Sequence, residues 1–287
     1  MSKFSELRTE YHKDIRRYII REVQNTKTHA GYFNMADGTN VSSVEISRKL
    51  VDQLPYAHDT NVVAGQTSGD LFEKFTLKFI EGAFKLLNSI RPGQWQYSTT
   101  QTEISHFDQY EHLAELAKFV RENKSLASII GAEYLIKPDI IIAREPVSEN
   151  ELKDINDIVN EDLSYYSPIL KRNKAHPSQI LHASISCKWT IRSDRSQNTR
   201  TEALNLIRNR KGNLPHIVAV TAEPLPTRIA TLALGTGDLD CVYHFALYEL
   251  QKAINDADKP DQLDLLNTMI EGRRLRDISD LPLDMAI

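Results

Sequence analysis

An alternating pattern occupies the segment Ile180-Leu181-His182-Ala183-Ser184-Ile185-Ser186-Cys187-Lys188-Trp189-Thr190-Ile191. Small and apolar side chains alternate with polar ones, which is the period-two pattern of a strand with one buried face. The alternation puts Ser186 and Lys188 on one face of the strand and the Cys187 side chain on the other. The pattern therefore predicts a core strand that carries a serine and a lysine near its end.

Further elements on both sides of this strand predict a sheet. The apolar, β-branched run at Tyr134–Ala143 indicates a second buried strand. A helix is expected at Ser196–Arg210, with more strands at His216–Ala222, Ile229–Leu234 and Cys241–Tyr248, the last of which is also compatible with the start of a helix. Strands interspersed with helices predict an α/β fold with a mixed central β-sheet flanked by helices.

The first part of the chain is predicted to be helical. Apolar side chains recur at helical spacing in four segments, at residues 1–25, 42–54, 71–88 and 110–123. Asp37-Gly38-Thr39-Asn40 is typical of a tight turn, and the acidic segment Glu145–Asp162 is expected to be a surface insertion. We expect a single domain over residues 1–287, with an N-terminal helical part and an α/β core at about residues 60–250.

The composition is that of an ordinary soluble globular protein, with 41% hydrophobic and 26% charged residues. The two cysteines, Cys187 and Cys241, cannot form a disulfide framework, and the sequence shows neither a signal peptide nor an apolar run of the roughly 18 residues that would span a membrane. We expect a cytoplasmic protein that makes no contact with a membrane.

The charge is unevenly distributed along the chain. The formal net charge is −4, which argues against a protein that coats nucleic acid through charge alone. Residues 171–211, however, hold ten basic and two acidic residues, whereas residues 236–287 hold five basic and eleven acidic ones. The basic segment is a candidate phosphate-binding surface or simply a solvated face.

Asp139 follows Pro138 within the predicted strand at Tyr134–Ala143. A buried carboxylate costs several kcal/mol unless a metal or a hydrogen-bond network compensates it. An acid on one strand and Lys188 on its neighbour are suited to holding a divalent cation and orienting water at a phosphodiester. The usual form of this motif has an acid two residues before the lysine, where this chain has Ser186. The second carboxylate is expected from Glu202 or Glu73, each of which could equally be a solvent-facing helix residue.

The segment Arg192-Ser193-Asp194-Arg195 follows the lysine strand directly. The arginine fork matches the O6 and N7 acceptors of guanine, and a carboxylate accepts from the N4 amino group of cytosine. The segment therefore suits the reading of G·C pairs in a major groove. The alternative is a surface ion pair at a helix N-terminus, capped by Ser193 or Asp194.

The sequence resembles the NgoMIV-like type II restriction endonucleases, the CCGG-recognising group of the PD-(D/E)xK nuclease superfamily. The resemblance extends from the Asp37 turn to the C-terminus and is weaker in the first 30 residues and in the acidic insertion. It is carried by the segments Leu181–Arg195, Val220–Pro224, Cys241–Leu250 and Asp277–Asp284. Segments of this length are far more specific than the short acid–lysine motif.

The resemblance implies a Mg²⁺-dependent nuclease with a restriction-endonuclease-like core. It implies that Asp139 and the main-chain carbonyl of Cys187 bind the metal, as two ions in each site, so that the Cys187 thiol need not be reactive. Ser186, Lys188, Glu202 and Glu73 match the other catalytic positions. A metal-bound water would attack phosphorus directly and release the 3′ oxygen, with no covalent intermediate.

The resemblance also implies the target. Arg192, Asp194 and Arg195 match the set that reads the inner CCGG, and Gln66 matches a residue that reads the outer G·C pair. Thr39 stands where the family has a serine, and it keeps the hydroxyl. The expected site is GCCGGC, cut after the first G to leave four-base 5′ ends.

A palindromic duplex requires at least a two-fold symmetric dimer, and the resemblance implies a homotetramer that binds two sites. It also places the enzyme in a restriction-modification system beside a cognate methyltransferase, with no direct contact implied.

Three other functions stay open on the residues alone. A repair or junction-cleaving nuclease of the same core would need no base-reading cluster. A non-catalytic DNA-binding protein would not need Asp139 or Lys188. A hydrolase of small phosphate esters would leave the basic segment unexplained.

Overall fold

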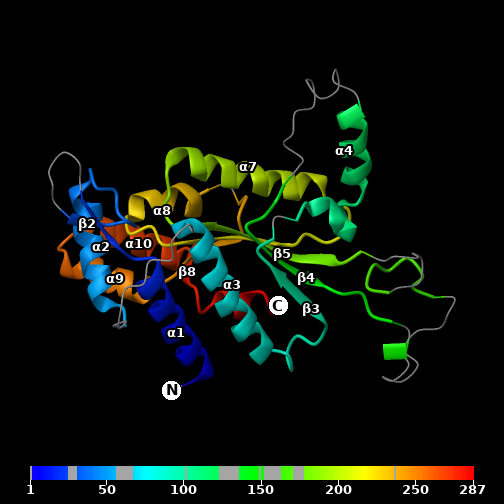
Figure 1. The fold of residues 1–287 in the computed structure, drawn as a ribbon, viewed down its shortest axis with the longest axis horizontal. Helices are drawn as coiled ribbons and strands as arrows, with labels where there is room; N and C mark the ends of the chain where they lie inside the picture. The colour runs from blue at the N-terminus through cyan, green and yellow to red at the C-terminus, as the bar shows by residue number, and fades with distance from the viewer. Residues whose placement is uncertain are drawn as a thin grey trace. The chain divides into compact units, whose positions relative to one another are not determined.

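The computed structural model describes residues 2–24, 31–55, 67–100, 102–122, 136–148, 150–151, 163–170, 178–235 and 237–287 (Figure 1). The chain divides into two compact units. The first comprises Met1–Arg91, Ile185–Thr201 and Ile217–Ile287, and the second comprises Pro92–Ser184 and Glu202–His216. The interpretation of residues 1–287 as one domain stays a prediction.

A six-stranded sheet has the order β3-β4-β5-β6-β7-β8. Its strands are β3 (Trp95–Ser98), β4 (Ile140–Arg144), β5 (Ile180–Lys188), β6 (His216–Thr221), β7 (Cys241–His244) and β8 (Leu275–Asp277). The β3–β4 pair is antiparallel, whereas β6 pairs with β7 and β7 with β8 in parallel. The predicted α/β class with a mixed central sheet flanked by helices is confirmed (Figure 1).

Helices of the first unit pack on one another and on its strands. They are α1 (Lys3–Tyr18), α2 (Val41–Gln53), α3 (Ser68–Leu86), α8 (Pro226–Ala233), α9 (Leu247–Asp256), α10 (Pro260–Glu271) and α11 (Leu281–Asp284). Helix α1 packs on α3, α2 packs on α9, and α10 packs on both α8 and α9. A two-stranded antiparallel sheet, β1 (Glu22–Gln24) with β2 (Gly31–Phe33), lies beside α2.

The second unit is built on β3, β4 and the first part of β5, with η1 (Ile104–His106), η2 (Asp108–Tyr110) and α4 (His112–Glu122). The buried Gln109 amide donates to the Leu181 carbonyl (2.8 Å) and accepts from the Leu181 N–H (3.0 Å), which fixes η2 against β5. Helix α7 (Ser193–Asn209) begins in the first unit and continues in the second.

Local sequence accounts for where the helices begin. Asn40 caps α2 by accepting from the Ser43 N–H at 2.9 Å. Thr67 caps α3, and its hydroxyl and the Asp70 carboxylate form a reciprocal capping box. The expected helix at residues 71–88 therefore begins three residues earlier. Among the described residues, no helix has the length and apolarity needed to cross a bilayer.

Two strand predictions need correction. The run at Ile229–Leu234 is not a strand, because Pro226 starts helix α8 over most of it. A short apolar run cannot by itself distinguish a strand from a buried helix. The strand expected at Tyr134–Ala143 begins only at Ile140 within the described residues, since Pro138 has no N–H to donate to a sheet.

Other boundaries also shift. The strand expected to reach Ile191 ends at Lys188, and the segment Cys241–Tyr248 is a strand to His244 and then helix α9 from Leu247. The helix expected over residues 1–25 ends at Tyr18 and gives way to β1, whose pairing with β2 the sequence analysis missed. It also missed β3, α10 and β8.

A partly buried ion cluster holds α1 to the rest of the first unit. Arg8 donates to both Asp277 oxygens (2.9 and 2.7 Å) and to both Glu249 oxygens (2.7 and 2.6 Å). Asp277 is 0% exposed and also accepts from the Leu247 N–H at 3.0 Å. Burial on its own would raise the pKa of Asp277, but the hydrogen bonds and the charge of Arg8, together with hydrogen bonds from Ser279, outweigh that effect and hold the pKa below its usual value.

We expect Arg8→Ala to lower the free energy of unfolding by about 3–5 kcal/mol, because it leaves the Asp277 charge buried without its cation. Urea unfolding followed by circular dichroism measures the loss. The matched control is Lys13→Ala, which removes an exposed partner of Glu10 and should change stability by no more than about 0.5 kcal/mol. Equal effects of the two substitutions would contradict a supporting role for the cluster.

Candidate functional site

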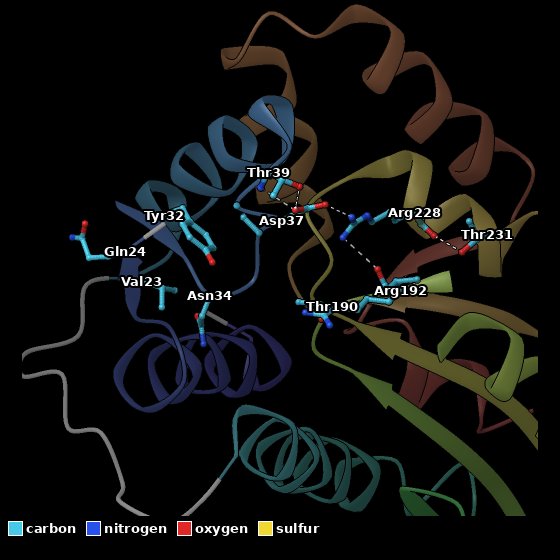
Figure 2. A pocket seen from close by; sticks show the side chains of 13 residues that line it. Val23, Gln24, Tyr32, Asn34, Asp37, Thr39, Thr190, Arg192, Arg228 and Thr231 are labelled. Atoms are coloured by element: carbon cyan, nitrogen blue, oxygen red, sulfur yellow. Dashed lines mark hydrogen bonds and ion pairs between the residues drawn. The ribbon is translucent and has the colours of Figure 1, made fainter. Parts of the chain in front are cut away.

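A pocket of about 840 Å³ lies within the first unit (Figure 2). Three stretches of chain line it, together with two residues of α8. The lining residues are Val23, Gln24, Tyr32, Asn34, Ala36, Asp37, Gly38, Thr39, Thr190, Ile191, Arg192, Arg228 and Thr231. Most of them carry hydrogen-bonding groups, and two of the predicted DNA-reading residues, Thr39 and Arg192, are among them.

One wall is the turn that precedes α2. Asp37 accepts two hydrogen bonds from Thr39, one from its N–H (2.9 Å) and one from its hydroxyl (2.7 Å). The Tyr32 ring lies so close to Gly38 that a Cβ there would come within 2.5 Å of it. Any other residue at position 38 would require the Tyr32 ring to move, and the same turn leaves Thr39 exposed.

The opposite wall is the chain that leaves β5, from Thr190 to Arg192. Ile191 is buried and Arg192 is exposed. The Arg228 guanidinium joins the two walls: it pairs with the Asp37 carboxylate and donates to the Ile191 carbonyl at 3.5 Å (Figure 2). The two predicted reading positions are thus held by one connected set of contacts.

Glu223 lies behind the second wall and is 0% exposed. Its carboxylate accepts from the Ile191 N–H (2.9 Å) and from the Leu225 N–H (3.2 Å), and Arg228 lies 3.9 Å away. Burial raises the pKa of Glu223 to about 7, against the opposing effect of these donors and of Arg228. Hydrogen bonds from Thr39 lower the pKa of Asp37, and Arg228 adds to this effect.

The end of β5 presents the predicted catalytic face. Ser186 and Lys188 are half-buried and alternate with buried Ile185 and Cys187, as the period-two pattern predicts. The Ser186 hydroxyl lies 3.4 Å from the Thr199 hydroxyl of α7. The Lys188 carbonyl accepts from the Thr221 hydroxyl (2.8 Å) and the Ala222 N–H (3.2 Å).

The predicted carboxylates fall in both units. Glu73 is half-buried on α3 in the first unit, whereas half-buried Asp139, just before β4, and half-buried Glu202, on α7, belong to the second. None of the three is a fully solvent-facing residue. The catalytic roles of all these residues stay predictions.

The structure does not describe the side chains of three predicted reading residues. Gln66 lies outside the described residues. Asp194 and Arg195 belong to the first turn of α7, but their side chains lie outside the described part of the chain. The ion pair or cap that the sequence analysis offered as an alternative for this segment therefore stays untested.

Neither Glu223 nor Arg228 was predicted from the sequence as a site residue. A signal for Glu223 was present, since an acid directly after the apolar run Ile217–Ala222 is as unusual as the one at Asp139. Arg228 gave no such signal, because its partner Asp37 is 191 positions away in the chain.

The residues expected to hold a metal provide hard oxygen ligands, the Asp139 carboxylate and the Cys187 main-chain carbonyl. Mg²⁺ is commonly bound through one or two carboxylates, with water and substrate phosphates completing its shell. This donor chemistry fits Mg²⁺. Over the described ranges, no group of three or more His, Cys, Asp or Glu side chains is arranged to hold a metal ion.

Comparison with known proteins gives a consistent result. The sequence matches the family described as NgoMIV restriction enzyme over residues 11–287. A curated relative, the type II restriction enzyme NgoMIV of Neisseria gonorrhoeae, is 46% identical over 288 residues, which is 99% of each chain.

Among solved structures, the type IIF restriction endonuclease Bse634I with cognate DNA has 12% identity and a TM-score of 0.33, and covers 86% of this chain and 99% of its own. The PspGI–substrate DNA complex has 16% identity and a TM-score of 0.27, and covers 92% and 97%.

The protein is a type II restriction endonuclease. The match covers nearly the whole chain, including the β5 strand and both walls of the pocket. The chain belongs to the NgoMIV restriction enzyme family.

Neither thiol should react in the native protein. Cys187 is 5% and Cys241 6% exposed, and burial raises the pKa of Cys241 to about 11. We expect Ellman's reagent at pH 8 to label no cysteine in the folded protein within the time in which it labels both in guanidinium chloride. Rapid native labelling of Cys187 would show that its side chain, rather than only its carbonyl, is accessible at the site.

Proposed function

We propose that this enzyme cuts double-stranded DNA at GCCGGC, after the first G, and leaves four-base 5′ ends. The observation that carries the proposal is the pocket that brings Thr39 and Arg192 together, with Arg192 only four residues beyond Lys188. Arg192 would read bases and Lys188 would act in cleavage. Because the two residues follow each other closely at the end of β5, recognition of a sequence would be coupled to cleavage beside it.

Recognition in this proposal rests on matching donors and acceptors. The guanidinium groups of Arg192 and Arg195 donate to guanine O6 and N7, and Asp194 accepts from cytosine N4, so that together they read the inner CCGG. Thr39 and Gln66 read the outer G·C pair. The hydrogen bond that the Thr39 hydroxyl donates to Asp37 supports this role, because it fixes the hydroxyl and leaves its oxygen free to accept from a base amino group.

Cleavage is a hydrolysis by direct attack of water on phosphorus, in which the 3′ oxygen leaves without a covalent intermediate. Asp139 and the Cys187 carbonyl would hold Mg²⁺, as two ions in each site. The metal would offset charge on the phosphate and lower the pKa of the attacking water. Lys188 contacts the scissile phosphate and positions the water, and Glu202 and Glu73 supply the carboxylates that the Ser186 position lacks.

The assembly follows from the target. A palindrome is matched by a two-fold dimer, and we propose a homotetramer of two such dimers that binds two sites. In a cytoplasmic restriction-modification system, a cognate methyltransferase would protect the same sequence on the host DNA.

The proposal is tested with plasmids that carry zero, one or two GCCGGC sites, incubated with Mg²⁺ or with EDTA. We expect cleavage only with Mg²⁺ and only at the site, and faster cleavage with two sites than with one. Lys188→Ala should bind the site and fail to cut it.

Site-specific binding by the wild type without cleavage in Mg²⁺ would identify a binding protein instead. Cutting of branched or scrambled DNA would favour a repair nuclease. Equal cutting of one-site and two-site plasmids would remove the tetramer from the proposal.

Arg192→Ala should reduce discrimination between GCCGGC and a duplex with one altered inner base pair by about 1–3 kcal/mol, because it removes a bidentate contact to guanine. Relative cleavage rates of the two duplexes measure this change. Arg273→Ala is the matched control, because Arg273 is exposed and does not line the pocket. Equal weakening on every sequence would assign Arg192 to a phosphate contact.

A further inference from the structure

The five-residue link from Lys188 to Arg192 is held near both ends by one short segment. Thr221, at the end of β6, donates its hydroxyl to the Lys188 carbonyl at 2.8 Å, and the Ala222 N–H donates to the same oxygen at 3.2 Å. Glu223 accepts from the Ile191 N–H at 2.9 Å. The beginning of the link and the residue before Arg192 are therefore tied to neighbouring positions on a single strand end.

The segment is itself internally fixed. The Glu223 N–H donates to the Thr221 hydroxyl (3.1 Å), and the other Glu223 oxygen accepts from the Leu225 N–H (3.2 Å). Thr221 and Glu223 are both 0% exposed. Buried, mutually satisfied polar groups have one low-energy arrangement, so this strand end is a rigid support rather than an adaptable one.

Stability does not account for a carboxylate at this position. A buried carboxylate that meets mainly backbone N–H groups pays a desolvation cost that an apolar side chain would avoid. The carboxylate can instead accept hydrogen bonds from two backbone N–H groups in different segments of the chain, those of Ile191 and Leu225. Such a group fixes the path of the main chain.

We propose that Thr221 and Glu223 are positioning residues that set the spacing between the cutting residue Lys188 and the reading residue Arg192. This inference rests on the proposed function of those two residues. Thr221 fixes the main chain at Lys188, and Glu223 fixes the main chain at Arg192. Neither residue is proposed to touch DNA.

The two positions should give different defects. Thr221→Val keeps the shape of the side chain and removes the hydroxyl, so we expect the single-turnover cleavage rate on GCCGGC to fall at least tenfold while the Kd measured without Mg²⁺ changes less than threefold. Thr221→Ser restores the hydroxyl and should restore the rate. Glu223→Gln places an amide N–H₂ against a backbone donor, and should lower discrimination against an altered inner base pair about tenfold.

Thr76→Val is the matched control for lost stability. Thr76 is also 0% exposed, and its hydroxyl is hydrogen-bonded to the Tyr11 hydroxyl at 2.9 Å, away from the pocket residues. It should lower the melting temperature as Thr221→Val does and leave rate and discrimination unchanged. All assays are run well below the lowest melting temperature of the set.

Two results would overturn the inference. One is equal cleavage rates for Thr221→Val and Thr221→Ser together with wild-type discrimination by Glu223→Gln. The other is a matching loss of rate in Thr76→Val. A wild type that cuts no DNA would instead refute the proposed function, and this inference with it. If it cuts a different site, the same ratios are measured there, and the inference is judged independently of the sequence GCCGGC.

Discussion

Strand β5 places its apolar side chains on one face, and this alternation determines which residues the other face presents at the site. Ala183, Ile185 and Cys187 are buried, so Ser186 and Lys188 must lie on the other face. A one-residue slip in pairing would bury the lysine and expose the core side chains, at a cost that the fold could not tolerate. The apolar face of β5 thus determines that Ser186 and Lys188 lie on the face proposed for catalysis. The same strand end then delivers Arg192 to the pocket.

Asp277 and Glu223 are both buried carboxylates of the first unit, but they have different partners and different structural roles. Asp277 meets the Arg8 guanidinium directly, and its pKa stays below its usual value. Glu223 meets mainly backbone donors, with Arg228 3.9 Å away, and burial raises its pKa to about 7. The first arrangement ties helix α1 to α9 and β8 through opposite charges. The second supplies little net attraction but fixes two main-chain segments, which is why its contribution is expected in reading and cutting rather than in stability.

Features that depend on local sequence were predicted correctly. The alternation along Ile180–Lys188 predicted β5 and the face that bears Lys188, and helical spacing predicted α3. The strand predicted at Ile229–Leu234 was wrong, because a mainly apolar run of six residues fits a strand or a buried helix equally well and only Pro226 favours the helix. The contact between Asp37 and Arg228 could not be predicted, because the two residues are 191 positions apart and no sequence motif links them. The segment Arg192–Arg195 was proposed as a reading segment from the donors and acceptors of its side chains, whereas Thr39 and Gln66 were proposed only from the family resemblance.

The net charge of −4 is a poor guide to what the pocket can bind. Arg192 and Arg228 both line the pocket, and Asp37 is the acidic residue among its lining side chains. Burial raises the pKa of Glu223 behind the wall to about 7, so near neutral pH it cancels less positive charge than an exposed glutamate would. The local field therefore favours an anionic ligand although the chain as a whole is acidic. Attraction at this pocket suits a restriction endonuclease, because every phosphate of its DNA partner carries a negative charge.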